Sequence, residues 1–209
     1  MDDKLTGKDI RDQIIQAGMN AIPYVGSPLA SLYFGIQNEK RFKRLESFYK
    51  ELNDELSHNA DDIKKLQNAN YNEQTAEIIN EIHEKIEKEE SEKKRIYYKH
   101  FFVNNVCNVL ILSYEQRKIF LEAIDHLSVL DLDLLRFLIE QRKKIQIGSI
   151  TRGNSTKYEI LGSINRLKHY GFIGIYTGSF VINGSTDNSF NDNVEASDYG
   201  KSFYAFINR

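Results

Sequence analysis

The chain has 209 residues, of which 41% are hydrophobic and 28% are charged. This composition supplies a hydrophobic core, so it excludes a wholly disordered chain and a collagen-like fibre. The formal net charge is −2, so attraction to nucleic acid needs a local basic patch. The single cysteine excludes an internal disulfide and a cysteine-based zinc finger. No basic segment followed by an apolar core opens the sequence, and we therefore expect a cytoplasmic protein.

The first half of the chain is predicted to be helical. A Thr-Gly-Lys-Asp sequence with capping-box spacing starts a helix near Gly7. This helix ends before Pro23, because the residue before a proline avoids the helical conformation. Ser27 and Pro28 suit the N-cap and the first position of the next helix. We therefore expect a helical hairpin over residues 7–57.

Two surfaces of this hairpin predict close helix packing. The second helix carries apolar residues at 3-4-3-4 spacing, which is typical of a coiled-coil seam facing a partner helix. The residues of this seam are Phe42, Leu45, Tyr49, Leu52 and Leu56. A ridge of small side chains, which lets two helix backbones approach closely, consists of Ser27, Ser31 and Gly35. Either the chain's own helices cover these surfaces, or a homo-oligomer or helical protein partner does.

The hairpin also has a membrane alternative, because no charged residue occurs from Gln13 to Asn38. A spanning helix needs about 20 consecutive, mainly apolar residues. Prolines and polar side chains divide this stretch into two helical segments that are too short to span. We favour a packed, soluble hairpin, with conditional membrane insertion as the alternative.

A charged helix is predicted over residues 73–100. Residues 84–95 hold ten charged side chains in twelve positions, many of them four residues from an opposite charge. This pattern is typical of a solvated helix. The apolar run that follows returns to the core. We therefore expect a helical region over residues 1–112 and a second domain over residues 113–209.

The second domain alternates helices with short strands. Its predicted helix caps are Ser113, Ser128, Thr156 and Ser197. The first three have capping-box spacing, and Gly171 can end the third helix in the left-handed conformation. The predicted strands cover residues 145–148, 172–176 and 194–196. The fold class that follows is mainly α, with a C-terminal α+β domain.

This order of helix, helix, short strand, helix and β-hairpin resembles the winged-helix superfamily. Residues 164–173, Ile-Asn-Arg-Leu-Lys-His-Tyr-Gly-Phe-Ile, resemble a third helix that runs into the first wing strand. Ser197 to Phe203 resemble the turn that often closes this domain. The resemblance implies a winged-helix-like C-terminal domain.

Residues 120–131, followed by this wing, are also similar to bacterial abortive-infection alpha-type proteins, which are thought to act in phage defence. The similarity covers about residues 96–209 and rests on apolar spacing and a Leu-Ser-x-x-Asp sequence. It brings no catalytic residue with it.

Residues 142–168 contain seven cationic side chains and one acidic side chain, the strongest basic patch in the chain. In a DNA-binding winged helix the third helix enters the major groove and the wing contacts the backbone. The candidate nucleic-acid-binding residues are Arg142, Lys143, Lys144, Arg152, Lys157, Ser163, Asn165, Arg166 and Lys168. The wing, however, carries Asp187, Asp192 and Glu195 and lacks cations between Thr177 and Ala196. DNA binding and protein docking therefore both stay open.

Motifs for catalysis, metal binding and cofactor binding are missing from the sequence. The five histidines lack metal-ligand spacing, and neither a Gly-rich phosphate loop nor a G-x-S-x-G sequence occurs. We therefore expect a non-enzymatic bacterial regulatory or phage-defence protein that binds a macromolecule through its C-terminal domain, with no cofactor. The alternatives are a DNA-binding transcriptional regulator and a membrane-acting effector that uses the N-terminal hairpin.

Overall fold

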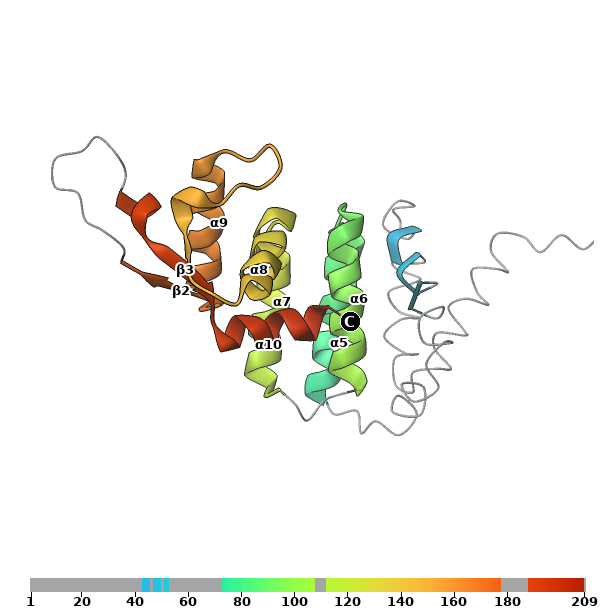
Figure 1. Ribbon diagram of the computed structural model, residues 1–209. Helices are drawn as coiled ribbons and strands as arrows, with labels where there is room; N and C mark the ends of the chain where they lie inside the picture. Colours follow the sequence, from blue (N-terminus) through green and yellow to red (C-terminus); the bar gives the residue numbers. More distant parts are fainter. Residues whose placement is uncertain are drawn as a thin grey trace, which may run out of the picture. The chain divides into compact units, whose positions relative to one another are not determined.

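The computed structural model describes residues 43–45, 47–49, 51–52, 73–107, 112–177 and 188–208. These residues form helices and, towards the C-terminus, a small three-stranded antiparallel sheet (Figure 1). The predicted mainly helical class is therefore confirmed. The chain divides into two compact units, Met1–Leu121 and Glu122–Arg209. None of the described helices is long and apolar enough to cross a lipid bilayer.

Only part of the predicted N-terminal hairpin falls within the described residues. Positions 43–45, 47–49 and 51–52 are helical, as expected for its second helix. Leu45, Tyr49 and Leu52 of the seam are buried. Phe42, Leu56, the small-residue ridge and the uncharged stretch lie outside the described residues.

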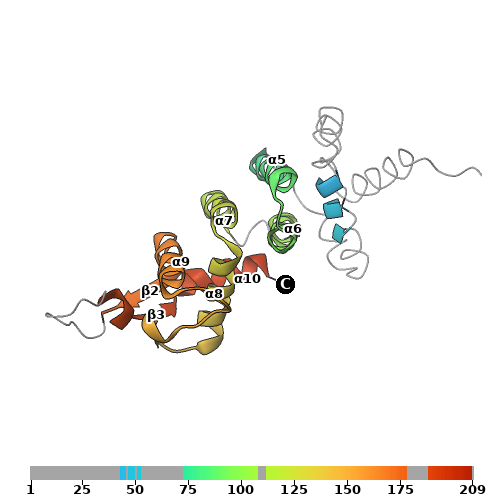
Figure 2. The ribbon, with the colours of Figure 1, turned by 90° about the horizontal axis from the view of Figure 1, so that it is seen from above.

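Two helices follow where the sequence predicted one charged helix over residues 73–100. They are α5 (Glu73–Lys88) and α6 (Glu92–Cys107), and they lie side by side in Figures 1 and 2. Ser91 separates them, because its hydroxyl accepts a hydrogen bond from the Lys94 backbone N–H at 3.3 Å. The Arg95 guanidinium donates to the Glu89 and Glu90 carbonyls at 3.1 and 3.2 Å. These contacts satisfy backbone groups at the break, which charge periodicity alone does not reveal.

Helix α7 (Tyr114–His126) begins at the predicted cap. The Ser113 hydroxyl accepts from the Gln116 backbone N–H, and the Gln116 side chain accepts from the Ser113 N–H, at 3.2 and 3.0 Å. The sequence placed the domain boundary at this cap, whereas the compact units divide within α7, after Leu121. The early part of α7 belongs with the first unit because Lys118 bonds Glu81 of α5 at 2.6 Å.

The second unit contains the remaining elements. They are α8 (Val129–Gln141), β1 (Ile145–Gln146), α9 (Lys157–His169), β2 (Ile173–Tyr176), β3 (Asn193–Ala196) and α10 (Asp198–Ile207). Strand β3 lies at the centre of the sheet, since Val194 is opposite both Ile145 of β1 and Ile175 of β2. The first strand is shorter than predicted, because a 3-10 turn over Ile147–Ser149 takes the chain out of the sheet.

Local capping decides where the helices of this unit begin. Reciprocal capping boxes join Ser128 to Asp131 at the start of α8 and Thr156 to Glu159 at the start of α9, as predicted. Gly171 has a φ of 73° beyond the end of α9, also as predicted. Each cap satisfies backbone N–H groups that lack a partner inside the helix.

The start of α10 is fastened to the start of β2. The Ser197 hydroxyl accepts from the Gly200 N–H at 2.9 Å and donates to the Gly171 carbonyl at 2.6 Å. The Ser197 N–H donates to the Phe172 carbonyl at 3.0 Å. Phe172 also stacks on Phe203 of α10, with ring centres 4.2 Å apart. These contacts place α10 against the core of the unit.

Candidate binding surface of the C-terminal unit

The solvent face of α9 carries four of the unit's exposed polar side chains. Lys157, Tyr158, Asn165 and Lys168 are all exposed along this helix. Tyr158 is 70% exposed although its ring meets that of Phe190 edge-on, with centres 5.4 Å apart. A helix with this spacing presents these side chains on one side and its apolar residues to the core.

Two predicted contact residues on α9, Ser163 and Arg166, are engaged by contacts within the protein instead. Ser163 is fully buried, so its hydroxyl is not available at the surface. The Arg166 guanidinium donates from Nε and Nη2 to the two carboxylate oxygens of Asp131, each at 2.8 Å. Arg166 therefore fastens α9 to the first turn of α8, and only part of its side chain faces solvent.

The Asp131 carboxylate is the centre of this junction. It is fully buried, and burial opposes its ionisation, but hydrogen bonds from Arg166, Ser163 and Ser128 outweigh burial and hold its pKa below the ordinary value. Contact with Asp131 raises the pKa of Arg166 in turn. The pair is therefore charged across the physiological pH range.

Three predicted cations follow the end of α8. Arg142, Lys143 and Lys144 are all exposed. Arg142 ends the helix in the left-handed conformation with a φ of 52°, a position that more often holds glycine or asparagine. The Lys144 ammonium lies 3.5 Å from the centre of the Tyr176 ring on β2, in a cation–π contact.

Acidic groups accompany these cations on the sheet. The Tyr176 hydroxyl bonds the Glu195 carboxylate of β3, which raises the pKa of Tyr176. Asp192 precedes β3 and is partly exposed, while Asp187 lies outside the described residues. Lys144 therefore contacts a tyrosine whose hydroxyl bonds the Glu195 carboxylate. That negative charge reduces the positive potential that a phosphate backbone would meet.

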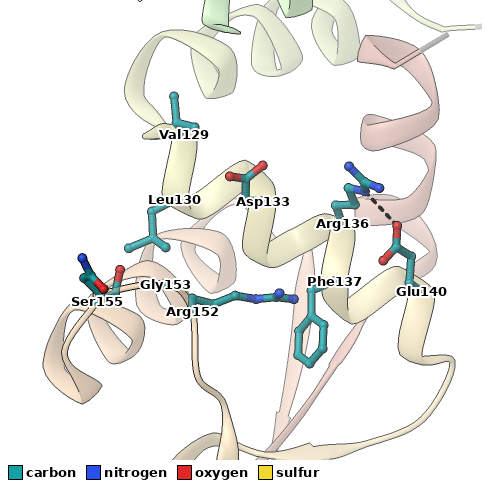
Figure 3. A pocket seen from close by; sticks show the side chains of 10 residues that line it. Val129, Leu130, Asp133, Arg136, Phe137, Glu140, Arg152, Gly153 and Ser155 are labelled. Atoms are coloured by element: carbon teal, nitrogen blue, oxygen red, sulfur yellow. Dashed lines mark hydrogen bonds and ion pairs between the residues drawn. The ribbon is translucent and has the colours of Figure 1, made fainter.

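Arg152 lies in a pocket against α8. The pocket has a volume of about 570 Å³ and is formed by residues 129–140 of α8 and by the loop 152–155. Figure 3 shows the Arg152 side chain reaching along α8 to Phe137, and the guanidinium carbon lies 3.7 Å from the ring centre. Arg136 and Glu140, which also border the pocket, form an ion pair at 2.7 Å. The sequence grouped Arg152 with the other cations and did not identify Phe137 or the pocket.

The first unit has its own buried polar contacts. The Tyr49 hydroxyl and His83 Nε2 form a hydrogen bond between the seam and α5. Phe48 meets Phe102 of α6 edge-on, with ring centres 5.8 Å apart. The described seam residues are therefore covered by side chains of the chain itself. Within the described ranges no group of three or more histidine, cysteine or acidic side chains is placed to hold a metal ion.

The chain was compared with protein-family models, with curated proteins and with solved structures. None of the three comparisons found a significant match.

Proposed function

We propose that the chain is a non-enzymatic bacterial regulatory or phage-defence protein that binds a partner protein through a winged-helix-like C-terminal unit. The order α7, α8, β1, α9, β2, β3 and the central place of β3 support this assignment of the fold. The sequence resemblances to winged-helix and abortive-infection alpha-type proteins also support it.

The observation that carries the proposal is the solvent face of α9. Tyr158 is 70% exposed, and Gly162 one turn later is partly exposed, with the Arg166 Nη1 atom 3.5 Å from where a Cβ would lie. Exposed tyrosines are enriched at protein interfaces, because the ring adds contact area and the hydroxyl adds a hydrogen bond. The bidentate contact between Arg166 and Asp131 keeps α9 fixed, so this face is presented without a cost for ordering the helix.

DNA binding is the second candidate, and a specific observation favours it. Six predicted cations are exposed in the structure, namely Arg142, Lys143, Lys144, Lys157, Arg166 and Lys168, and of these Arg166 is paired with Asp131. Asn165 is also exposed on α9, between Lys157 and Lys168 in the sequence. Asparagine side chains can form hydrogen bonds to adenine in the major groove. The buried position of Ser163 and the pairing of Arg166 weigh against a larger contact set on this helix.

Two matched variants separate these candidates. Lys157→Gln with Lys168→Gln removes two exposed cations of α9, and Tyr158→Ala with Gly162→Leu alters its docking face. As a phage-defence effector the expressed chain should arrest growth, and for partner docking we expect the second variant alone to lose this growth arrest. Salt-sensitive duplex binding that falls, with a flatter salt slope, in the lysine variant would establish the DNA-binding candidate instead. Both variants are first checked for wild-type helicity.

The membrane-acting alternative concerns the uncharged stretch, which lies outside the described residues. A charge introduced at Ala21, together with membrane fractionation of the expressed chain, tests it. Growth arrest that depends on Ala21 and not on the α9 face would replace the docking proposal.

A further inference from the structure

The pocket between α8 and the loop 152–155 contains two charged groups that form no direct ion pair with another described residue. Arg152 makes no ion pair with a described carboxylate, and its Nε is buried without a hydrogen-bond acceptor. Asp133 borders the same pocket and likewise forms no direct ion pair with a described residue, although it lies near enough to Arg136 to interact with its charge. The other two charges of the pocket, Arg136 and Glu140, form an ion pair at 2.7 Å, and Glu140, with a smaller contribution from Asp133, raises the pKa of Arg136.

Arg152 is well suited to hold a carboxylate. Its guanidinium is already stacked 3.7 Å from the centre of the Phe137 ring, so much of its conformational freedom is lost before a ligand arrives. A planar guanidinium matches the two oxygens of a carboxylate.

Asp133 provides a negative charge at the same pocket, which suits a cationic group of a ligand. It is exposed on α8, and its ionised carboxylate accepts hydrogen bonds only. In Figure 3, Asp133 stands on α8 above the Arg152 side chain, and Leu130 and Phe137 provide apolar surface beside them. A ligand that fits this arrangement carries an anionic group, a cationic donor and apolar atoms.

We propose that this pocket binds a zwitterionic small molecule of the amino-acid or short-peptide class. Its carboxylate contacts Arg152, its ammonium group contacts Asp133, and its side chains lie on Leu130 and Phe137. The volume of about 570 Å³ is within the range of small-molecule sites. The site is separate from the exposed face of α9 and does not depend on the function proposed for that face.

Three dipeptides that differ only at their ends test the proposal with the full chain. They are leucylleucine, its N-acetyl form, which lacks the ammonium, and its C-terminal amide, which lacks the carboxylate. Binding is measured by calorimetry and by amide chemical shifts. We expect leucylleucine to bind at least about tenfold more tightly than either capped form, because each loses a charge-assisted hydrogen bond.

Variants assign each end of the ligand to its residue. Arg152→Gln should weaken leucylleucine about tenfold and leave the amide unchanged, while Asp133→Asn should weaken leucylleucine and leave the N-acetyl form unchanged. Lys157→Gln, an exposed cation that does not border the pocket, is the matched control. Equal affinity for the three dipeptides, no saturable binding at millimolar concentration, or indifference to both pocket variants overturns the proposal.

Discussion

Arg166 shows how one residue can look like a nucleic-acid contact and still serve the fold. It lies in the most basic stretch of the sequence, yet two of its nitrogens bond the buried Asp131 carboxylate. Asp131 was predicted only as a capping residue, because that role is visible three residues from Ser128. Its second role joins residues 35 positions apart, and a single sequence gives no signal for such a pair.

Replacement of Arg166 should therefore lower stability before it affects binding. Arg166→Gln leaves a buried carboxylate without its cation, and we expect the free energy of unfolding to fall by roughly 2 kcal/mol, less than for a wholly buried pair because Arg166 is partly exposed. Urea denaturation measures this change. Lys168→Gln, an exposed change on the same helix, should stay within about 0.5 kcal/mol of the wild type. Equal stability of the two variants would contradict the role given to Arg166.

The buried His83 predicts a loss of stability in mild acid. Burial lowers its pKa to about 3 in the folded protein, from an ordinary value of 6.5. Below pH 6.5 the unfolded chain therefore binds a proton that the folded protein does not, and stability falls by about 1.4 kcal/mol for each pH unit. Between pH 7 and pH 5 this amounts to about 2 kcal/mol, measured by denaturant unfolding at the two pH values.

Two variants assign that pH dependence to one residue. His83→Asn should be less stable at both pH values but should lose most of the difference between them. His169→Gln removes a histidine that is exposed in the folded protein and should keep the difference. A difference that persists in His83→Asn would mean that another group causes it.

At the scale of elements, the glycines of α9 and α10 have opposite roles. A Cβ atom on Gly200 would lie 2.1 Å from the Phe172 carbonyl oxygen, whereas one on Gly162 would meet only the Arg166 Nη1 atom, at 3.5 Å. Gly200→Ala should therefore cost about 3 kcal/mol or prevent folding. Gly162→Ala should be neutral or add up to about 1 kcal/mol, because alanine favours the helix. Thermal denaturation distinguishes them, and a shift of the same sign in both would contradict the packing described at Gly200.

The elements that the sequence predicted well are those with local signals. The starts of α7, α8, α9 and α10 all depend on a side chain that bonds a backbone N–H three residues later, and that spacing is visible in the sequence. The break between α5 and α6 was missed because opposite charges continue through it. Only Ser91 marks it, and a serine within a charged run is not a specific signal.

At the scale of the whole molecule, the pocket was beyond prediction for a different reason. In the pocket, Arg152 from a loop packs against Phe137, which lies two turns into α8. The sequence around each of these residues contains no motif that predicts the contact. The predicted fold class needed only periodicity and caps, whereas the site needs the position of a loop on a helix.

The burial of the seam within the single chain leads to a prediction about self-association. Leu45 is only 6% exposed in the single chain, so a partner has little left to cover at this position. Leu45→Ala should lower the free energy of unfolding by about 2–4 kcal/mol, as expected for a buried leucine. It should leave the dependence of sedimentation on protein concentration unchanged. A variant that dissociates an oligomer without losing stability would show that the seam is an interface between chains.

The contacts of Ser197 determine where the chain tolerates an insertion. Ser197 bonds the carbonyls of Gly171 and Phe172, so the two ends of the β2–β3 hairpin are joined at its base independently of the residues between the strands. Lengthening that connection adds only loop-closure entropy, about 0.6 kcal/mol for each doubling. A short Gly-Ser insertion after Thr177 should therefore leave the melting temperature within a few degrees of the wild type. The same insertion after Gly171 should abolish folding of the unit, so the connection after β2 is where this protein can gain new sequence without losing its core.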